Sequence, residues 1–139
     1  MVSRKDAMIA KEKAITENEI SHVLVEIFLK VHRELGPGLL ESVYEEAICH
    51  ELIKRNIPFT RQEGISVFYD TVKMDLGFRA DIIVCNKVIV ELKSVEAIAP
   101  VHPKILLTYL RLTKLKLGLL VNFNVPLIKN GILRIVNNL

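Results

Sequence analysis

Apolar residues in the first third of the chain recur every three or four positions, the spacing of one face of a helix. They predict a helix from about Thr16 to Leu35. Thr16 and Glu19 match a capping box at its start, and Gly36-Pro37-Gly38 should end it. A second helix is expected from about Leu39 to Arg55. Its inward-facing residues would be Leu40, Val43, Tyr44, Ala47 and Ile48.

The rest of the chain consists mainly of short apolar runs between turn residues, a pattern typical of β-strands. Strands are expected at about 58–63, 65–69, 78–84, 88–94 and 117–123. A third helix should run from about Pro100 to Lys114, and Asn130-Gly131 predicts a hairpin between residues 127–128 and 132–136. This order indicates an α/β fold with a central mixed sheet and helices packed on it.

Composition adds limits to this picture. The 139 residues should form one domain from residue 16 to 139, preceded by a flexible tail at residues 1–15. A net charge of +3 permits a nucleic-acid partner without requiring one. Cys49 and Cys85 lack the spacing of a zinc site or a disulfide framework, so we expect buried thiols in a cytoplasmic protein. No apolar run reaches the roughly 18 residues of a membrane span, so no membrane partner is expected.

Asp81, Glu91 and Lys93 are charged residues inside apolar, strand-like runs, where an unpaired charge is costly. If residues 85–87 form a three-residue loop, Asp81 lies directly opposite Glu91, whereas a two-residue loop sends Asp81 to the other face. Two facing carboxylates favour a cation between them, and hard oxygen ligands suit Mg²⁺ or Mn²⁺. The alternative is a structural ion-pair cluster at the edge of the sheet.

Acids on the second helix are further candidates. Glu41 and Glu45 lie four positions apart, so one of them could turn towards the sheet and complete a carboxylate cage. The alternative is a solvated acidic face, which we favour for Glu45 and Glu46.

Several other side chains are candidates for contact with a substrate. They are polar or cationic residues on the predicted site strand and the third helix: Arg79, His102, Lys104, Tyr109 and Arg111. For Arg79 an ion pair with Glu91 is an equal alternative, and for His102 a capping role is the stronger one. Tyr109 has the helical spacing of a core residue first.

The segment Gly38-Leu39-Leu40-Glu41-Ser42-Val43-Tyr44 resembles the signature of the GxxExxY proteins, which are grouped with the PD-(D/E)XK nuclease superfamily. Arg79-Ala80-Asp81 and Val90-Glu91-Leu92-Lys93 extend the resemblance, which covers about Ile20 to Val136. It implies a restriction-endonuclease-like core in the order α-β-β-β-α-β, with Ala80 in place of the name-giving proline. Asp81 and Glu91 would then bind the metal ion together with the Leu92 backbone carbonyl. Lys93 would activate the attacking water, and Glu41 would assist the metal site.

The expected function is therefore that of a metal-dependent nuclease that hydrolyses phosphodiester bonds of nucleic acid, with DNA as the expected substrate. One departure concerns the position four residues before Tyr109, where related nucleases often carry Gln and this chain has Ile105. The alternative is a catalytically silent nuclease-like domain that binds nucleic acid or protein, including a homodimer. A third hypothesis is a structural protein whose acids are ion-paired.

Overall fold

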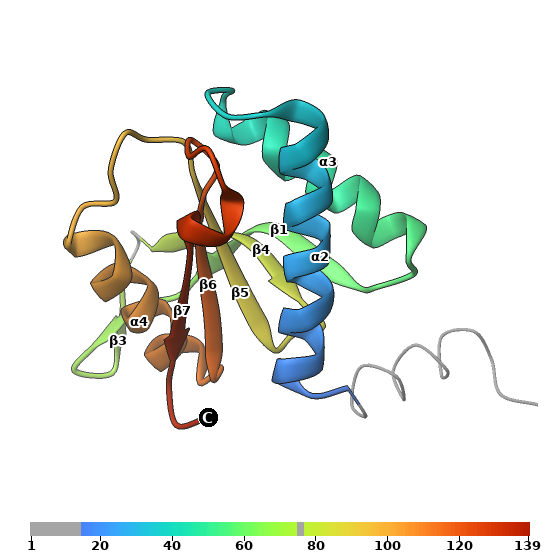
Figure 1. Cartoon of the computed structure of the whole chain (residues 1–139). Coiled ribbons are helices and arrows are strands. Elements are labelled where there is room, and N and C mark those ends of the chain that lie inside the picture. The colour runs from blue at the N-terminus through green and yellow to red at the C-terminus, as the bar shows by residue number, and fades with distance from the viewer. Residues whose placement is uncertain (1–14, 75–76) are drawn as a thin grey trace, which may run out of the picture.

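The computed structural model describes residues 15–74 and 77–139, so nearly all of the tail expected at residues 1–15 lies outside the described residues (Figure 1). The described helices are α2 (Glu17–Leu35), α3 (Glu41–Lys54), α4 (Val101–Thr113) and the short 3₁₀ helix η1 (Ile128–Gly131). The described strands are β1 (Phe59–Ile65), β2 (Phe68–Tyr69), β3 (Val72–Lys73), β4 (Phe78–Val84), β5 (Val88–Lys93), β6 (Leu117–Asn122) and β7 (Ile132–Val136).

Five of these strands form one sheet in the spatial order β1-β4-β5-β6-β7, while β2 and β3 form a separate hairpin. The pairs β1–β4, β4–β5 and β6–β7 are antiparallel, and the pair β5–β6 is parallel. Parallel neighbours need a crossover connection, and α4 supplies it. The expected α/β fold with a central mixed sheet is confirmed.

Helices cover both faces of the large sheet (Figure 1). On one face, α2 and α3 share an apolar cluster with Ile82 and Val90. On the opposite face, α4 shares a second cluster with Ile83 and Ile89. The central strands are thus buried on both sides, which explains why their sequences are apolar without alternation. The charged residues of β4 and β5 lie beyond the segment in which these two strands pair.

The expected boundaries of α2 are confirmed. The Thr16 hydroxyl accepts a hydrogen bond from the Glu19 backbone N–H at 3.1 Å, and the Thr16 backbone N–H donates to the Glu19 carboxylate at 3.4 Å. This reciprocal pair is the predicted capping box. Gly36 ends the helix with a φ of 73°, and its N–H donates to the His32 carbonyl at 2.7 Å.

The predicted inner face of α3 is partly wrong. Tyr44 and Ile48 are fully buried, as expected, but Leu40 and Val43 are 75% and 40% exposed. Leu40 is the residue before the helix rather than part of it. The buried stripe continues at i+4 spacing to Leu52, so Val43 lies beside this stripe and not on it.

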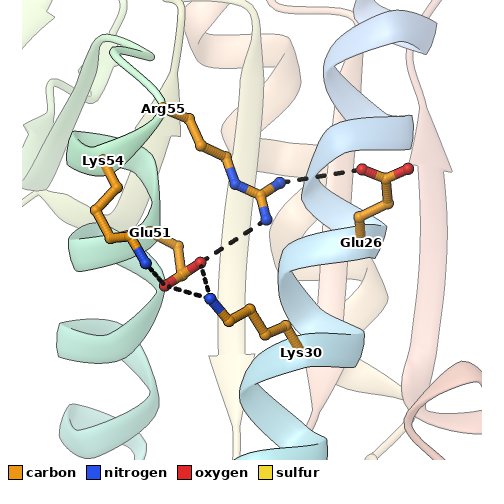
Figure 2. Close-up of polar contacts among 5 residues, drawn as sticks. All are labelled: Glu26, Lys30, Glu51, Lys54 and Arg55. Atoms are coloured by element: carbon orange, nitrogen blue, oxygen red, sulfur yellow. Dashed lines mark hydrogen bonds and ion pairs between the residues drawn. The ribbon is translucent and has the colours of Figure 1, made fainter.

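An ion-pair cluster joins α2 to α3 (Figure 2). The Glu51 side chain of α3 is only 9% exposed, and its carboxylate accepts a hydrogen bond from Lys30 of α2 at 3.0 Å. Lys54 at 3.5 Å and Arg55 at 3.7 Å contact the same carboxylate, and Arg55 reaches Glu26 of α2 at 4.0 Å. The hydrogen bond from Lys30 lowers the pKa of Glu51, against the opposing effect of burial. The ionised form of Glu51 therefore ties the two helices together.

In the described part of the chain, residues 127–128 form no strand, and β7 pairs with β6 instead, so the hairpin predicted from Asn130-Gly131 between residues 127–128 and 132–136 is wrong. Neither residue has the positive φ of the turn type that this pair favours, and both lie in η1. A Cβ at Gly131 would lie 2.2 Å from the Asn122 carbonyl oxygen. Glycine is thus required here by a close approach of two backbone segments and not by a turn.

Two expectations from composition can be compared with the structure. Cys49 and Cys85 are buried thiols, each 3% exposed, as expected. None of the helices in the described ranges combines the length and the hydropathy of a membrane span.

Candidate active site

The register of the β4–β5 hairpin is the one on which the candidate site depends. Val84 pairs with Val88 and Ile82 pairs with Val90, so residues 85–87 form a three-residue loop. Cys85 and Asn86 in this loop have φ values of 52° and 50°, which lets so short a loop close. One step beyond the last pair, this register puts Asp81 opposite Glu91. Of the two loop lengths that the sequence left open, the structure has the three-residue loop, on which the metal hypothesis depends.

The side chains of the two acids replace backbone hydrogen bonds where β4 and β5 separate. The Asp81 backbone N–H donates to Glu91 Oε1 at 3.1 Å. The Leu92 backbone N–H donates to Asp81 Oδ2 at 2.8 Å. Each carboxylate is therefore fixed by the strand that carries the other one. Glu91 lies two positions from Ile89 and therefore on the side of β5 covered by α4.

Glu91 has the most perturbed titration in this region. Burial and then the charge of Asp81 raise the pKa of Glu91 from 4.5 to about 8, while the Asp81 N–H and Lys93 act in the opposite direction. Tyr109 of α4 responds to the same charges. Its pKa is raised by burial first and then by Glu91 and Asp81. The phenol of Tyr109 therefore lies close to the acids, and its ring packs on Phe78 at a centroid distance of 5.0 Å.

The end of β5 and the residues after it are held by contacts from two other segments, the end of β6 and the start of α3. The Lys93 carbonyl accepts a hydrogen bond from the Phe123 N–H at 2.9 Å. Asn122 is buried, and its amide bonds both the N–H and the carbonyl of Val95, at 3.1 and 2.9 Å. Ser94 Oγ donates to the Leu39 carbonyl at 2.6 Å, next to the start of α3. Lys93, which shares the strand face of Glu91, thus projects from a fixed backbone.

Glu45 differs from its sequence interpretation. It is 7% exposed rather than solvated, and its Oε2 accepts hydrogen bonds from Arg61 Nη2 at 2.8 Å and Nε at 3.2 Å. Gln62 Nε2 donates to Glu45 Oε1 at 2.7 Å and to Asp81 Oδ1 at 3.3 Å. Of the two acids proposed to turn towards the sheet, it is Glu45 that does so. Gln62 and Arg61 were missed because neither belongs to a recognisable motif.

The other predicted residues lie around this pair. Glu41 is exposed in the first turn of α3 and, among the described residues, makes no hydrogen bond or ion pair. Arg79 Nη1 donates to the Gln62 carbonyl at 3.1 Å, so the described contacts do not include the proposed ion pair with Glu91. His102 Nδ1 accepts from the Ala99 N–H at 3.2 Å, which is the capping alternative. Lys104 and Arg111 are exposed on α4.

Comparison with known proteins identifies the family. The chain matches the family model described as the PD-(D/E)XK nuclease superfamily over residues 18–135, and it therefore belongs to that superfamily. Membership indicates a nuclease with a nucleic-acid substrate, and nucleases of this superfamily generally use divalent metal ions. No curated protein and no solved structure matches the chain significantly.

The side chains at this site could hold such an ion between two carboxylates, but they do not surround it with three or more. In the ranges 15–74 and 77–139, no three His, Cys, Asp or Glu side chains converge as a metal site. Asp81 and Glu91 provide two facing carboxylates, and the raised pKa of Glu91 shows that a second negative charge here is unfavourable. A cation would relieve this repulsion. Mg²⁺ is commonly held by one or two carboxylates with water and phosphate as its other ligands.

Proposed function

We propose that this protein is a Mg²⁺- or Mn²⁺-dependent nuclease that hydrolyses phosphodiester bonds in DNA, and that it belongs to the GxxExxY group within its superfamily. The observation that carries the proposal is the pair of carboxylates that face each other where β4 and β5 separate, both of them partly buried and one with a pKa raised to about 8. Two partly buried carboxylates that face each other are costly for a merely structural role, because the ionisation of one disfavours the ionisation of the other.

Asp81 and Glu91 would hold the ion as a pair, with the Leu92 carbonyl as a further ligand, and Glu41, exposed at the start of α3, would assist the site without completing a carboxylate cage. The bound ion would polarise the scissile phosphate and lower the pKa of a water molecule. Lys93 projects from the same strand face as Glu91, so its ammonium group would stabilise negative charge that develops on the phosphate and orient the attacking water.

Substrate binding would use the cationic and aromatic side chains around this pair: Arg79, His102, Lys104, Tyr109 and Arg111. Lys104 and Arg111 are exposed on α4, which covers the face of the sheet that bears Glu91. Such residues would neutralise backbone phosphates and make binding weaken with rising salt. A cytoplasmic location, consistent with two buried thiols, is part of the same proposal.

The test is cleavage of linear duplex DNA, single-stranded DNA and RNA in Mg²⁺ or Mn²⁺. Asp81→Asn and Lys93→Met should each reduce the rate by about 100-fold or more. Asp70→Asn and Lys129→Met are matched controls, because both residues are exposed away from the acid pair, and they should cleave as the wild type does. A wild type that cuts none of these substrates, or an Asp81→Asn protein with full activity, would refute the proposal.

A second candidate function is that of a nuclease-like binding module, including a homodimer. It is favoured by the lack, among the described residues, of a third acid that converges with Asp81 and Glu91. Ile105 in the position of the related nucleases' Gln points the same way. Salt-dependent binding of DNA without cleavage in either metal, and a dimer in sedimentation, would select this alternative.

A further inference from the structure

Two consecutive residues of β1 contact the same carboxylate, which a regular strand does not allow. Neighbouring side chains on a strand point to opposite faces. Arg61 Nη2 nevertheless donates to Glu45 Oε2 at 2.8 Å, and Gln62 Nε2 donates to Glu45 Oε1 at 2.7 Å. Gln62 has a φ of 51°, a left-handed conformation that is unfavourable for a residue with a Cβ. The strained backbone of Gln62 thus accompanies a side-chain position from which its amide reaches Glu45.

The amide of Gln62 connects two acids that would otherwise repel each other. Its Nε2 carries two hydrogens, and it lies 2.7 Å from Glu45 Oε1 and 3.3 Å from Asp81 Oδ1. The opposite amide orientation would present an oxygen to both carboxylates, which can only accept. The contacts of Gln62 therefore require the donor orientation.

Glu45, the α3 end of the Glu45–Gln62–Asp81 link, is held in place by other contacts. Glu45 is 7% exposed, and the Arg61 guanidinium that holds it also pairs with Glu46 at 3.0 Å. On the other side, Asp81 Oδ2 is held by the Leu92 N–H at 2.8 Å. One oxygen of the Asp81 carboxylate is thus held by the backbone of β5. The other oxygen is held by Gln62, which is itself bound to Glu45 of α3.

We propose that Gln62 is a positioning residue that holds Asp81 in the orientation needed for metal binding, and that Glu45 acts on Asp81 through Gln62. This inference rests on the proposed function. It explains why β1 keeps a strained residue beside the acid pair and why a buried glutamate on α3 faces the edge of the sheet. Residues that orient a metal ligand typically change metal affinity by about 10-fold or more when they are replaced.

The experiment measures Mn²⁺ binding to the full chain by calorimetry, with thermal unfolding of each variant as a check of folding. Gln62→Met keeps the length of the side chain and removes the amide, so the Kd for Mn²⁺ should rise about 10-fold. Glu63→Gln, at the exposed next position of β1, is the control and should bind as the wild type does. Glu45→Gln should weaken binding as well, but it should add nothing in the Gln62→Met background, because Glu45 acts through Gln62.

The outcomes separate the two proposals. Wild-type protein that binds no Mn²⁺ refutes the proposed function and the positioning role with it. Wild-type protein that binds, together with folded Gln62→Met of unchanged affinity, refutes the positioning role and leaves the function standing. Additive losses in the double variant would show that Glu45 does not act through Gln62, contrary to the proposal. If Gln62→Met binds weakly because it is unfolded, its affinity does not report on the positioning role. Gln62→Gly, which suits the positive φ at this position, is therefore measured beside it, and its affinity decides the result.

Discussion

Replacement of Glu91 by Gln should make the metal-free protein more stable at alkaline pH. The pKa of Glu91 rises from 4.5 to about 8 in the folded state because the carboxylate is buried and faces Asp81. A group with a raised folded pKa contributes stability that is fully present below pH 4.5 and is lost as the pH rises through 8. The glutamine side chain of the variant cannot ionise, so the variant should not lose this contribution.

The size of the effect follows from the same values. At about 1.4 kcal/mol for each pH unit, the rise from 4.5 to about 8 corresponds to about 5 kcal/mol. Relaxation of the site and entry of water would reduce this cost, so we expect Glu91→Gln to gain about 2–4 kcal/mol over the wild type at pH 9. At pH 4.5 the two proteins should differ little, because the glutamate is largely protonated in the folded state.

The assay is urea unfolding at pH 5, 7 and 9 in the presence of EDTA. Glu96→Gln is the matched control, because Glu96 is exposed and should give the same pH profile as the wild type. Wild type and Glu91→Gln differ at this one titratable group, so the difference between their pH profiles isolates Glu91. If wild type and Glu91→Gln lose equal stability between pH 5 and pH 9, burial and the charge of Asp81 do not disfavour the ionised form of Glu91 as inferred.

Three further substitutions test the packing that supports the site. Glu51→Gln should cost about 1 kcal/mol at pH 7 in chemical unfolding. Because the pKa of Glu51 is lowered, the contribution of its ion pairs to stability is present above pH 4.5 and is lost at lower pH. The wild type should therefore lose its greater stability in acid. A wild type that is still more stable than Glu51→Gln at pH 2 would contradict this reasoning. Tyr44→Phe should cost about 1–2 kcal/mol, since the hydroxyl donates to the Gly36 carbonyl at 2.6 Å and accepts from the Leu39 N–H at 3.1 Å. An unchanged urea midpoint would show that water replaces both bonds. Gly131→Ala should cost about 2 kcal/mol or more, because the added Cβ would lie 2.2 Å from the Asn122 carbonyl oxygen. Gly64→Ala is the control and should be nearly neutral, because nothing lies within 4 Å of its added Cβ. Equal melting temperatures of the two variants would refute the close approach.

The sequence by itself determined the features that depend on neighbours along the chain. The capping box of α2 and the stop at Gly36 follow from local spacing. Asp81 and Glu91 could be singled out as candidate ligands because they are charged residues in apolar, strand-like runs. In a hairpin the loop length sets the register, so the choice between a two-residue and a three-residue loop stayed open until the structure paired Val84 with Val88.

Only the tertiary structure decided the features that depend on residues distant in sequence. Glu45 is buried because Arg61 and Gln62, 16 and 17 positions away, fill its hydrogen-bonding capacity. Gly131 is a glycine because a Cβ at this position would lie 2.2 Å from the Asn122 carbonyl oxygen. A helical or strand pattern records which face of an element is apolar, but it does not record which partner comes to lie against a polar residue. Long-range packing supplies that partner, and here it turned an expected solvated acid into the support of the acid pair.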